Sequence, residues 1–354
     1  MTILRSFEIT SDASKKEKNA MSSHLEEAAR KLYERSKILR EILRNATGET
    51  AAPGYWMRCA TADATRTPLL EELCRQIHAE LDSFSEAVRS EIETRPKWEP
   101  GAPLSSDKVW LWGGPTPEWG GSMQPDTLVS NARYFNIENG VYVYGATSEE
   151  MIQRHADMKQ LLCMVSSTCR APGQQPETDA ECAEKLSRLS LKYPNIRGGM
   201  MDDMTNSSTT ISKEKVEQIR TISTNLKKHN PALELYGVIY QHELAEKDFT
   251  EIVPYLDGVN LWFWNQEKLL DLEKSVDHCR YHFPKKKILL GLFIHDYGTS
   301  DTGTLPELLL YELKGARALL AKGKIDGLVI LGDREVLKWP EQAALVRGFL
   351  EAQL

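Results

Sequence analysis

Eight short apolar runs follow one another from residue 107 to the end of the chain, and most gaps between them hold one run with helical periodicity. Continuous apolar strands that alternate with helices are typical of a parallel sheet covered on both faces. Eight such units in about 250 residues favour a closed (β/α)8 barrel. An open doubly wound sheet is the alternative, but Gly113-Gly114-Pro115 after the first run is not a Gly-rich phosphate loop.

The eight strands are predicted at Lys108–Trp112, Val141–Gly145, Leu161–Ser166, Ile196–Asp203, Leu233–Tyr240, Gly258–Trp264, Ile288–His295 and Gly327–Leu331. Helices are predicted after the second to eighth strands at Glu149–Met158, Asp179–Leu191, Ser212–His229, Phe249–Leu256, Gln266–His282, Leu305–Lys322 and Glu341–Gln353. The segment from Pro115 to Ile137 shows no strong helical pattern, so we expect a long active-site loop there.

Residues 1–105 differ from the rest because they have helical periodicity and no strand-like run. One amphipathic helix is predicted from Ser22 to about Leu43, and a second begins at Thr67-Pro68, with Thr67 as its N-cap. We therefore predict a helical hairpin over residues 1–105 and a barrel domain over residues 106–354. The apolar stripes of the hairpin need a partner. That partner is either the flank of the barrel or a second copy of the chain in a homo-oligomer.

Composition and charge argue against some classes of partner. Hydrophobic residues make up 41% of the chain and charged residues 27%, as in ordinary globular proteins. The net charge of -7 and the lack of a Lys/Arg run argue against a nucleic-acid partner. No apolar segment reaches transmembrane length, nothing resembles a secretory signal, and the six cysteines are scattered without C-x-x-C spacing. We expect a cytoplasmic protein with reduced thiols and no membrane partner.

Two adjacent carboxylates, Asp202 and Asp203, end the fourth predicted strand. The C-terminal ends of barrel strands carry the chemistry, and a carboxylate there is a candidate acid, base or nucleophile. Side chains alternate along a strand, and Ile196 and Met200 share the parity of Asp202 and suit the helix interface. Asp203 is therefore predicted to face the barrel interior as the reactive group, with Asp202 as its orienting neighbour. The alternative is that the pair caps the next loop or binds Arg197.

Other strand ends offer partners for this pair. Hydrolysis with two carboxylates needs one protonated and one ionised group, and Glu243 after strand five or Asp296 after strand seven could supply the second. Tyr240, Gln241, His242 and His295 at the same ends are candidates to bind hydroxyl groups. For Glu243 the competing interpretation is a solvated cap of the following turn. For Asp296 it is a hydrogen bond that ties down Tyr297-Gly298.

Aromatic residues near the strand ends are a second indication of a ligand-binding site. Flat faces at a barrel mouth suit the C–H faces of sugar rings, so the candidates for ligand contact are Trp112, Tyr144, Trp264 and Tyr297. The neighbouring aromatics Trp110, Tyr142 and Trp262 are predicted to fill the core, because aromatic residues also favour strands and barrel layers.

The barrel portion, residues 106 to 354, resembles glycoside-hydrolase (β/α)8 barrels. The resemblance rests on Trp110-Leu111-Trp112-Gly113, Gly199-Met200-Met201-Asp202-Asp203, Asp257-Gly258-Val259-Asn260-Leu261-Trp262 and Gly291-Leu292-Phe293-Ile294-His295-Asp296-Tyr297. It implies that a carboxylate after strand four is catalytic, which carries over to Asp203 or Asp202. The large retaining clan has Asn-Glu after strand four and Glu after strand seven, whereas this chain has Asp-Asp and His-Asp.

The first hypothesis is a glycosidase that acts on a small saccharide or glycoside and needs no cofactor. The second is a metal-dependent lyase, isomerase or hydrolase that holds a divalent ion with His242, His295 and Asp203. His278 and His282 also have metal-competent i, i+4 spacing, but they fall on an outer helix where a solvated face is expected. The third is a catalytically silent barrel whose helical hairpin mediates assembly.

Overall fold

The computed structural model describes residues 23–39, 68–116, 122–145, 147–166, 177–205, 210–300, 302–332 and 335–354. The chain divides into two compact units, which we describe one at a time. The first comprises residues 1–97, 265–270 and 296–311, and the second comprises residues 98–264, 271–295 and 312–354.

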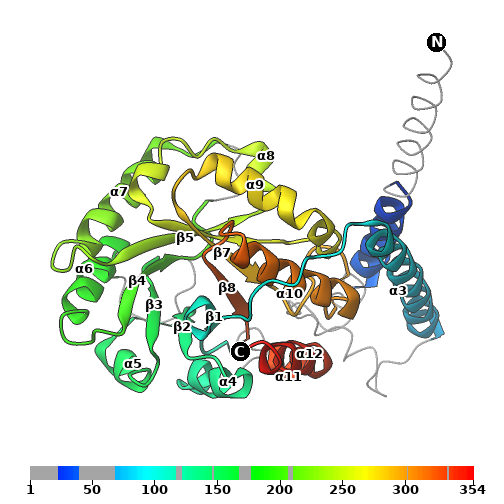
Figure 1. The fold of residues 1–354 in the computed structure, drawn as a ribbon, viewed down its shortest axis with the longest axis horizontal. Helices are drawn as coiled ribbons and strands as arrows, with labels where there is room; N and C mark the ends of the chain where they lie inside the picture. The colour runs from blue at the N-terminus through cyan, green and yellow to red at the C-terminus, as the bar shows by residue number, and fades with distance from the viewer. Residues whose placement is uncertain are drawn as a thin grey trace, which may run out of the picture. The chain divides into compact units, whose positions relative to one another are not determined.

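The second unit is built on a closed barrel of eight parallel strands, joined in the order of the sequence from β1 to β8 and back to β1 (Figure 1). The strands are β1 Val109–Gly113, β2 Asn139–Tyr142, β3 Gln160–Met164, β4 Ile196–Met201, β5 Glu234–Tyr240, β6 Gly258–Trp262, β7 Lys287–Leu292 and β8 Gly327–Leu331. Nearly every strand residue is buried, because side chains fill the interior on one face and helices cover the other. The predicted (β/α)8 barrel is confirmed.

Helices lie between the strands, as expected for βα units. The longer ones are α4 Thr127–Phe135, α5 Glu149–Arg154, α6 Asp179–Leu189, α7 Lys213–Leu226, α9 Leu272–His282, α10 Pro306–Ala321 and α12 Pro340–Glu351, and the short ones are α8 Glu243–Glu246 and α11 Glu335–Lys338. The helix predicted at Phe249–Leu256 is wrong, because only the single 3-10 turn Val253–Tyr255 forms there.

The predicted long loop between β1 and β2 is also wrong, since it contains α4. Leu128, Ala132 and Phe135 are buried at helical spacing, and the helix stops at Asn136, which adopts a left-handed conformation with φ of 56°. This i, i+4, i+7 spacing is a helical pattern that the expectation of a loop overlooked, and burial of the three side chains stabilises the helix through tertiary packing.

One extra residue interrupts the pairing of β3 with β4. Leu161 pairs with Ile196, but the next residue, Leu162, pairs with Gly198, so Arg197 has no counterpart. This is a β-bulge, and it reverses the inward and outward alternation of every β4 residue that follows it.

The residues after the bulge therefore face the opposite way from the prediction. A Cβ atom on Gly199 would lie 3.3 Å from Leu226 of α7, so Gly199 faces the helix layer. Met200 alternates with it and faces the barrel interior. The alternation predicted for β4, which put Met200 at the helix interface, therefore does not hold after the bulge. Asp202 and Asp203 follow the end of the strand.

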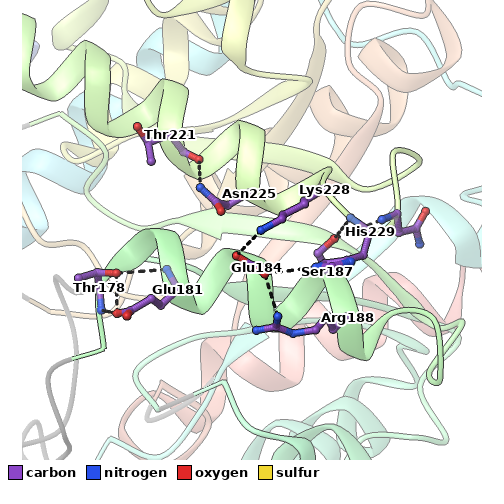
Figure 2. Close-up of polar contacts among 10 residues, drawn as sticks. Thr178, Glu181, Glu184, Ser187, Arg188, Thr221, Asn225, Lys228 and His229 are labelled. Carbon is purple, nitrogen blue, oxygen red and sulfur yellow. Dashed lines mark hydrogen bonds and ion pairs between the residues drawn. The ribbon is translucent and has the colours of Figure 1, made fainter.

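Polar contacts join α6 to the turn after α7 (Figure 2). Glu184 of α6 accepts from Lys228 at 3.1 Å and from Arg188 at 2.8 Å, and its Oε1 lies 3.3 Å from Nε2 of His229. The hydrogen bond from Lys228 is the main cause that lowers the pKa of Glu184. This group lies beside the segment that enters β5, whereas such barrels carry their chemistry at the C-terminal ends of the strands.

The first unit contains a helix over residues 23–39 and α3, Pro68–Thr94. The two helices are joined by Arg35, which contacts Gln76 at 2.5 Å and Glu80 at 3.6 Å. Arg89 of α3 also pairs with Glu307 at 2.6 Å. The predicted helix pair is confirmed, while Ser22, the predicted start of the first helix, and Thr67, the predicted N-cap of the second, lie outside the described residues.

Among the helices that the structure describes, none combines the length and the apolar character needed to cross a bilayer. The compartment of the protein stays a prediction.

Substitution of Gly291 tests how tightly the barrel interior is packed. A Cβ atom there would lie 2.1 Å from the ring of Trp262, so Gly291→Ala is expected to destabilise the fold by about 1–3 kcal/mol through overpacking. Gly348 of α12 is the matched control, because a Cβ atom added there would meet nothing within 4 Å. Gly348→Ala is expected to stabilise by about 0.5–1 kcal/mol. Urea unfolding measures both, and equal effects of the two changes would contradict the interpretation.

Glu184→Gln is expected to change the pH dependence of stability. The folded-state pKa of Glu184 is lowered, so its contribution is present above the unfolded pKa of about 4.3 and is lost as pH falls through the folded value. The Tm difference between wild type and variant should therefore be largest near neutral pH and vanish in acid. Glu251→Gln, at an exposed position, is the control. A Tm difference that stays constant from neutral pH into acid would contradict this assignment.

Candidate active site

The Asp202-Asp203 pair lies at the C-terminal end of β4, in the turn that follows Met201. Asp202 is buried, with 8% of its surface exposed, whereas Asp203 is exposed. Asp203 has a φ of 43°, in the left-handed region that non-glycine residues rarely adopt. Its backbone N–H donates to Oδ1 of Asp202 at 3.0 Å. Asp202 thus holds the backbone turn that presents Asp203.

Tyr240, the last residue of β5, connects the neighbouring strand end to this pair. Its hydroxyl donates to Oδ1 of Asp203 at 2.7 Å. Burial is the main cause that raises the pKa of Tyr240 well above its usual value, and the charges of Asp203 and Asp202 add to it. The hydroxyl therefore stays protonated and acts as a hydrogen-bond donor to the Asp203 carboxylate. We call Asp202, Asp203 and Tyr240 the carboxylate–tyrosine cluster.

Two rings surround Tyr240. His242 is exposed and stacks on it, with ring centroids 5.7 Å apart and an interplanar angle of 11°. Trp264, which follows β6, packs edge to face against Tyr240 at 5.6 Å and is 39% exposed. An exposed tryptophan face beside an exposed carboxylate is an arrangement that can receive a polar ring with an apolar face.

Glu243 lies close along the chain but is held differently. It is 4% exposed, and its carboxylate accepts from Nζ of Lys247 at 2.5 Å, from the Thr205 hydroxyl at 2.5 Å and from the backbone N–H of Tyr240 at 2.9 Å. The Lys247 side chain is also buried. These contacts favour a structural role, in which a buried ion pair fixes the turn after β5.

A second group of aromatic residues fills the end of the barrel interior. Trp112 of β1 packs edge to face on Trp262 of β6 at 5.6 Å, and Trp262 stacks on Phe293 at 4.5 Å. The indole N–H of Trp112 donates to the Tyr144 hydroxyl at 2.9 Å, and Tyr144 has a φ of 69°. Strands β1 and β6 are not neighbours in the barrel, so Trp112 and Trp262 meet across its interior.

Of the remaining candidates in this unit, His295 is almost fully buried, and its Nδ1 accepts from the indole N–H of Trp339 at 2.8 Å. This hydrogen bond places the proton of a neutral His295 on Nε2. Gln241 is half-buried, and its backbone N–H donates to the carbonyl oxygen of Trp262 at 2.8 Å.

Asp296 and Tyr297 belong to the first unit. Asp296 is 2% exposed and accepts from the Ser300 hydroxyl at 2.7 Å and from the side chain of Gln266 at 2.9 Å, with further bonds from the backbone of residues 266, 299 and 300. These bonds organise the loop after β7. They match the competing structural interpretation of Asp296, in which it ties down the turn that contains half-buried Tyr297.

A metal centre needs several ligands that point at one ion. In the part of the chain that the structure describes, no group of three or more His, Cys, Asp or Glu side chains is placed to hold one. His242, His295 and Asp203 do not form such a set, and the ring of His295 is already bonded to Trp339 through Nδ1. The metal-dependent hypothesis receives no support from the arrangement of these residues.

Four residues of this region were not foreseen as parts of it: Thr205, Lys247, Phe293 and Trp339. Lys247 is four residues after Glu243, a spacing that pairs opposite charges on a helical turn and could have been recognised. Phe293 shares parity with Gly291, whose Cβ position faces Trp262, so strand alternation could also have found it. Thr205 and Trp339 carry no sequence signal for their roles.

The sequence matches no family model and no curated protein. Among solved structures, a Bacteroides thetaiotaomicron protein assigned as an alpha-L-fucosidase is 9% identical, with a TM-score of 0.50 over 73% of this chain and 96% of that one. The Bacillus cereus spore cortex-lytic enzyme SleL is 11% identical, with a TM-score of 0.45 over 71% and 75% of the two chains. A family GH18 chitinase from Chromobacterium violaceum is 10% identical, with a TM-score of 0.44 over 73% and 91%. At 9% identity the likeness to the Bacteroides protein concerns the fold alone, and the predicted resemblance to glycoside-hydrolase barrels is confirmed at that level.

The role of Glu243 can be tested through its ion pair. Glu243→Ala removes the carboxylate from a buried lysine and is expected to destabilise the fold by about 3–5 kcal/mol. The double variant Glu243→Gln with Lys247→Met removes both charges and should recover most of that loss. Chemical unfolding measures the stability of each variant. If the single substitution left stability unchanged, the ion pair would not be what holds this turn.

Proposed function

We propose that this chain is an enzyme that cleaves a glycosidic bond in a small saccharide or glycoside, by carboxylate acid/base chemistry at the C-terminal face of the barrel. The observation that carries the proposal is the carboxylate–tyrosine cluster. It combines an exposed carboxylate, a neighbour that fixes its backbone and a protonated hydroxyl that orients it, all at two adjacent strand ends. Strand ends of this kind are where such barrels place their catalytic groups.

In this proposal Asp203 is the residue that reacts, as acid or as nucleophile, because it is the exposed member of the pair. Asp202 acts through the N–H of Asp203 and sets its position. Tyr240 donates to one oxygen of Asp203, so the carboxylate has a defined orientation before a substrate binds. Positioning of this kind lowers the reorganisation needed in the transition state.

The sugar would be bound by the surrounding rings. Trp264 offers an exposed face beside Tyr240, and His242 offers ring nitrogens that can bond hydroxyl groups. Trp112 at the end of β1 and Tyr144 after β2 are further candidates to contact the sugar, and a hydrogen bond joins them to each other. Gln241, His295 and Tyr297 remain predictions as substrate contacts, since their described contacts are with the protein.

The contacts of Glu243 and Asp296 favour structural roles for both. Each is buried and already accepts several hydrogen bonds. We therefore assign the acid/base work to Asp203, with Asp202 as the residue that positions it. This chemistry calls for no cofactor.

A panel of chromogenic glycosides assayed with wild type and variants tests the proposal. Asp203→Asn keeps the shape and removes the reactive group, and is expected to lower kcat by about 100- to 10,000-fold. Asp202→Asn should lower kcat less, because Asn retains an oxygen that can accept from the N–H of Asp203. Tyr240→Phe should lower kcat while leaving the fold intact. Asp82→Asn, at an exposed position on α3, is the control and should keep full activity.

Treatment with a chelator separates this proposal from a metal-dependent enzyme. Activity that survives removal of metal and is lost in Asp203→Asn supports carboxylate chemistry. An activity that Asp203→Asn and Asp202→Asn both leave at the wild-type level would refute the assignment of the site. A chain that turns over no glycoside in the panel would favour the silent-barrel hypothesis.

A further inference from the structure

Two histidines on the outer helix α9 bring their ring nitrogens together. His278 and His282 are four residues apart, and their Nε2 atoms lie 3.2 Å from each other. The rings are 4.9 Å apart and tilted by 46° rather than stacked. His278 is exposed and His282 is half-buried, so the pair is reachable from solvent while one ring is partly fixed.

A third electron-pair donor points at the same place. The carbonyl oxygen of Leu244, in α8, lies 2.9 Å from Nε2 of His282. Phe249 packs edge to face on His282 at 5.4 Å and holds that ring toward α8. A neutral imidazole Nε2 carries either one proton or one lone pair in the ring plane. A single proton on Nε2 of His282 can therefore form a well-aligned hydrogen bond with the Leu244 carbonyl or with His278, but not with both.

The separation of the two nitrogens suits a shared metal ion. Two imidazole nitrogens that bind one tetrahedral zinc ion at about 2.0–2.1 Å lie about 3.3 Å apart. The observed 3.2 Å is close to that value. The i, i+4 spacing on a helix produces this geometry without distortion, because residues four apart lie on the same face.

We propose that His278 and His282 form a binding site for a divalent transition-metal ion on the outside of the barrel, with the Leu244 carbonyl as a further oxygen donor. Two imidazole ligands select ions such as Zn²⁺, Ni²⁺ or Cu²⁺. They disfavour Mg²⁺ and Ca²⁺, which take oxygen ligands. Water completes the coordination, so the site is open and binds more weakly than a closed structural zinc site.

The bound ion joins α9 to the turn after β5. Leu244 follows Glu243, whose carboxylate holds the N–H of Tyr240. The ion therefore stabilises the segment that carries one side of the carboxylate–tyrosine cluster, from outside the barrel. This site does not depend on the proposed glycosidase activity, and it uses none of the residues assigned to that chemistry.

Titration of the full, untagged chain with Zn²⁺ and with Ni²⁺, after removal of bound metal, tests the proposal. Calorimetry should show one saturable site, and His278→Ala should weaken binding by about 100-fold, given that changes next to metal ligands alone cost about 10–100-fold. His282→Asn is the second variant and should weaken binding similarly. His24→Ala, an exposed histidine on the helix over residues 23–39, is the matched control and should bind as wild type does.

Copper EPR identifies the ligands directly. Wild type loaded with one equivalent of Cu²⁺ should show superhyperfine coupling to two imidazole nitrogens, and His278→Ala should show coupling to one. Unchanged affinity in both His278→Ala and His282→Asn would overturn the proposal, as would the absence of saturable binding. In that last case the pair is a surface hydrogen bond between histidines. His278→Ala alters only an exposed side chain, so the folding of this variant is expected to be normal.

Discussion

Closure of eight parallel strands into one ring is the constraint on which the rest of the structure depends. Each of the eight barrel strands pairs with a neighbour on both sides, and β8 pairs with β1. The barrel therefore has no edge strand with unpaired backbone N–H and C=O groups. Each strand is then buried on both faces, by the barrel interior and by the helix layer. Polar side chains are accommodated mainly where strands end. That is why Asp202, Asp203 and Tyr240 gather at adjacent strand ends.

A bulge in β4 and a left-handed turn after it set the surroundings of the two carboxylates. Arg197 shifts the pairing of β4 with β3 by one position, and the alternation that follows is reversed. Asp202, in the turn after the strand, is nearly enclosed, whereas Asp203 has a left-handed backbone and is exposed. The exposed Asp203 carboxylate is thus placed by a turn and not by strand alternation. Asp203 is still the favoured reactive residue, but the reason is its exposure and not its parity in the strand.

The carboxylates near the strand ends fall into two kinds according to how their charges are compensated. Glu243 is enclosed with Lys247, and Asp296 is enclosed by hydroxyl, amide and backbone donors. Burial of a charge is costly unless it is paired and hydrogen-bonded, so such groups stabilise the turns that they hold. Asp203 instead combines exposure with a hydrogen bond from Tyr240. This contrast, more than position in the sequence, separates the reactive candidate from its structural neighbours.

The sequence by itself determined the barrel, because apolar runs and amphipathic runs alternate with periods that local chemistry sets. It also located the Asp202-Asp203 pair, since strand ends could be predicted to within a few residues. Only the tertiary structure decided the bulge at Arg197 and the hydrogen bonds of Glu243 with Thr205 and of Asp296 with Gln266. These features depend on pairing register or on contacts between residues that are distant in sequence, and they leave no periodic pattern in one segment alone. The exposed Asp203 beside Tyr240 is therefore a joint result, in which the residue was visible in the sequence and its environment was not.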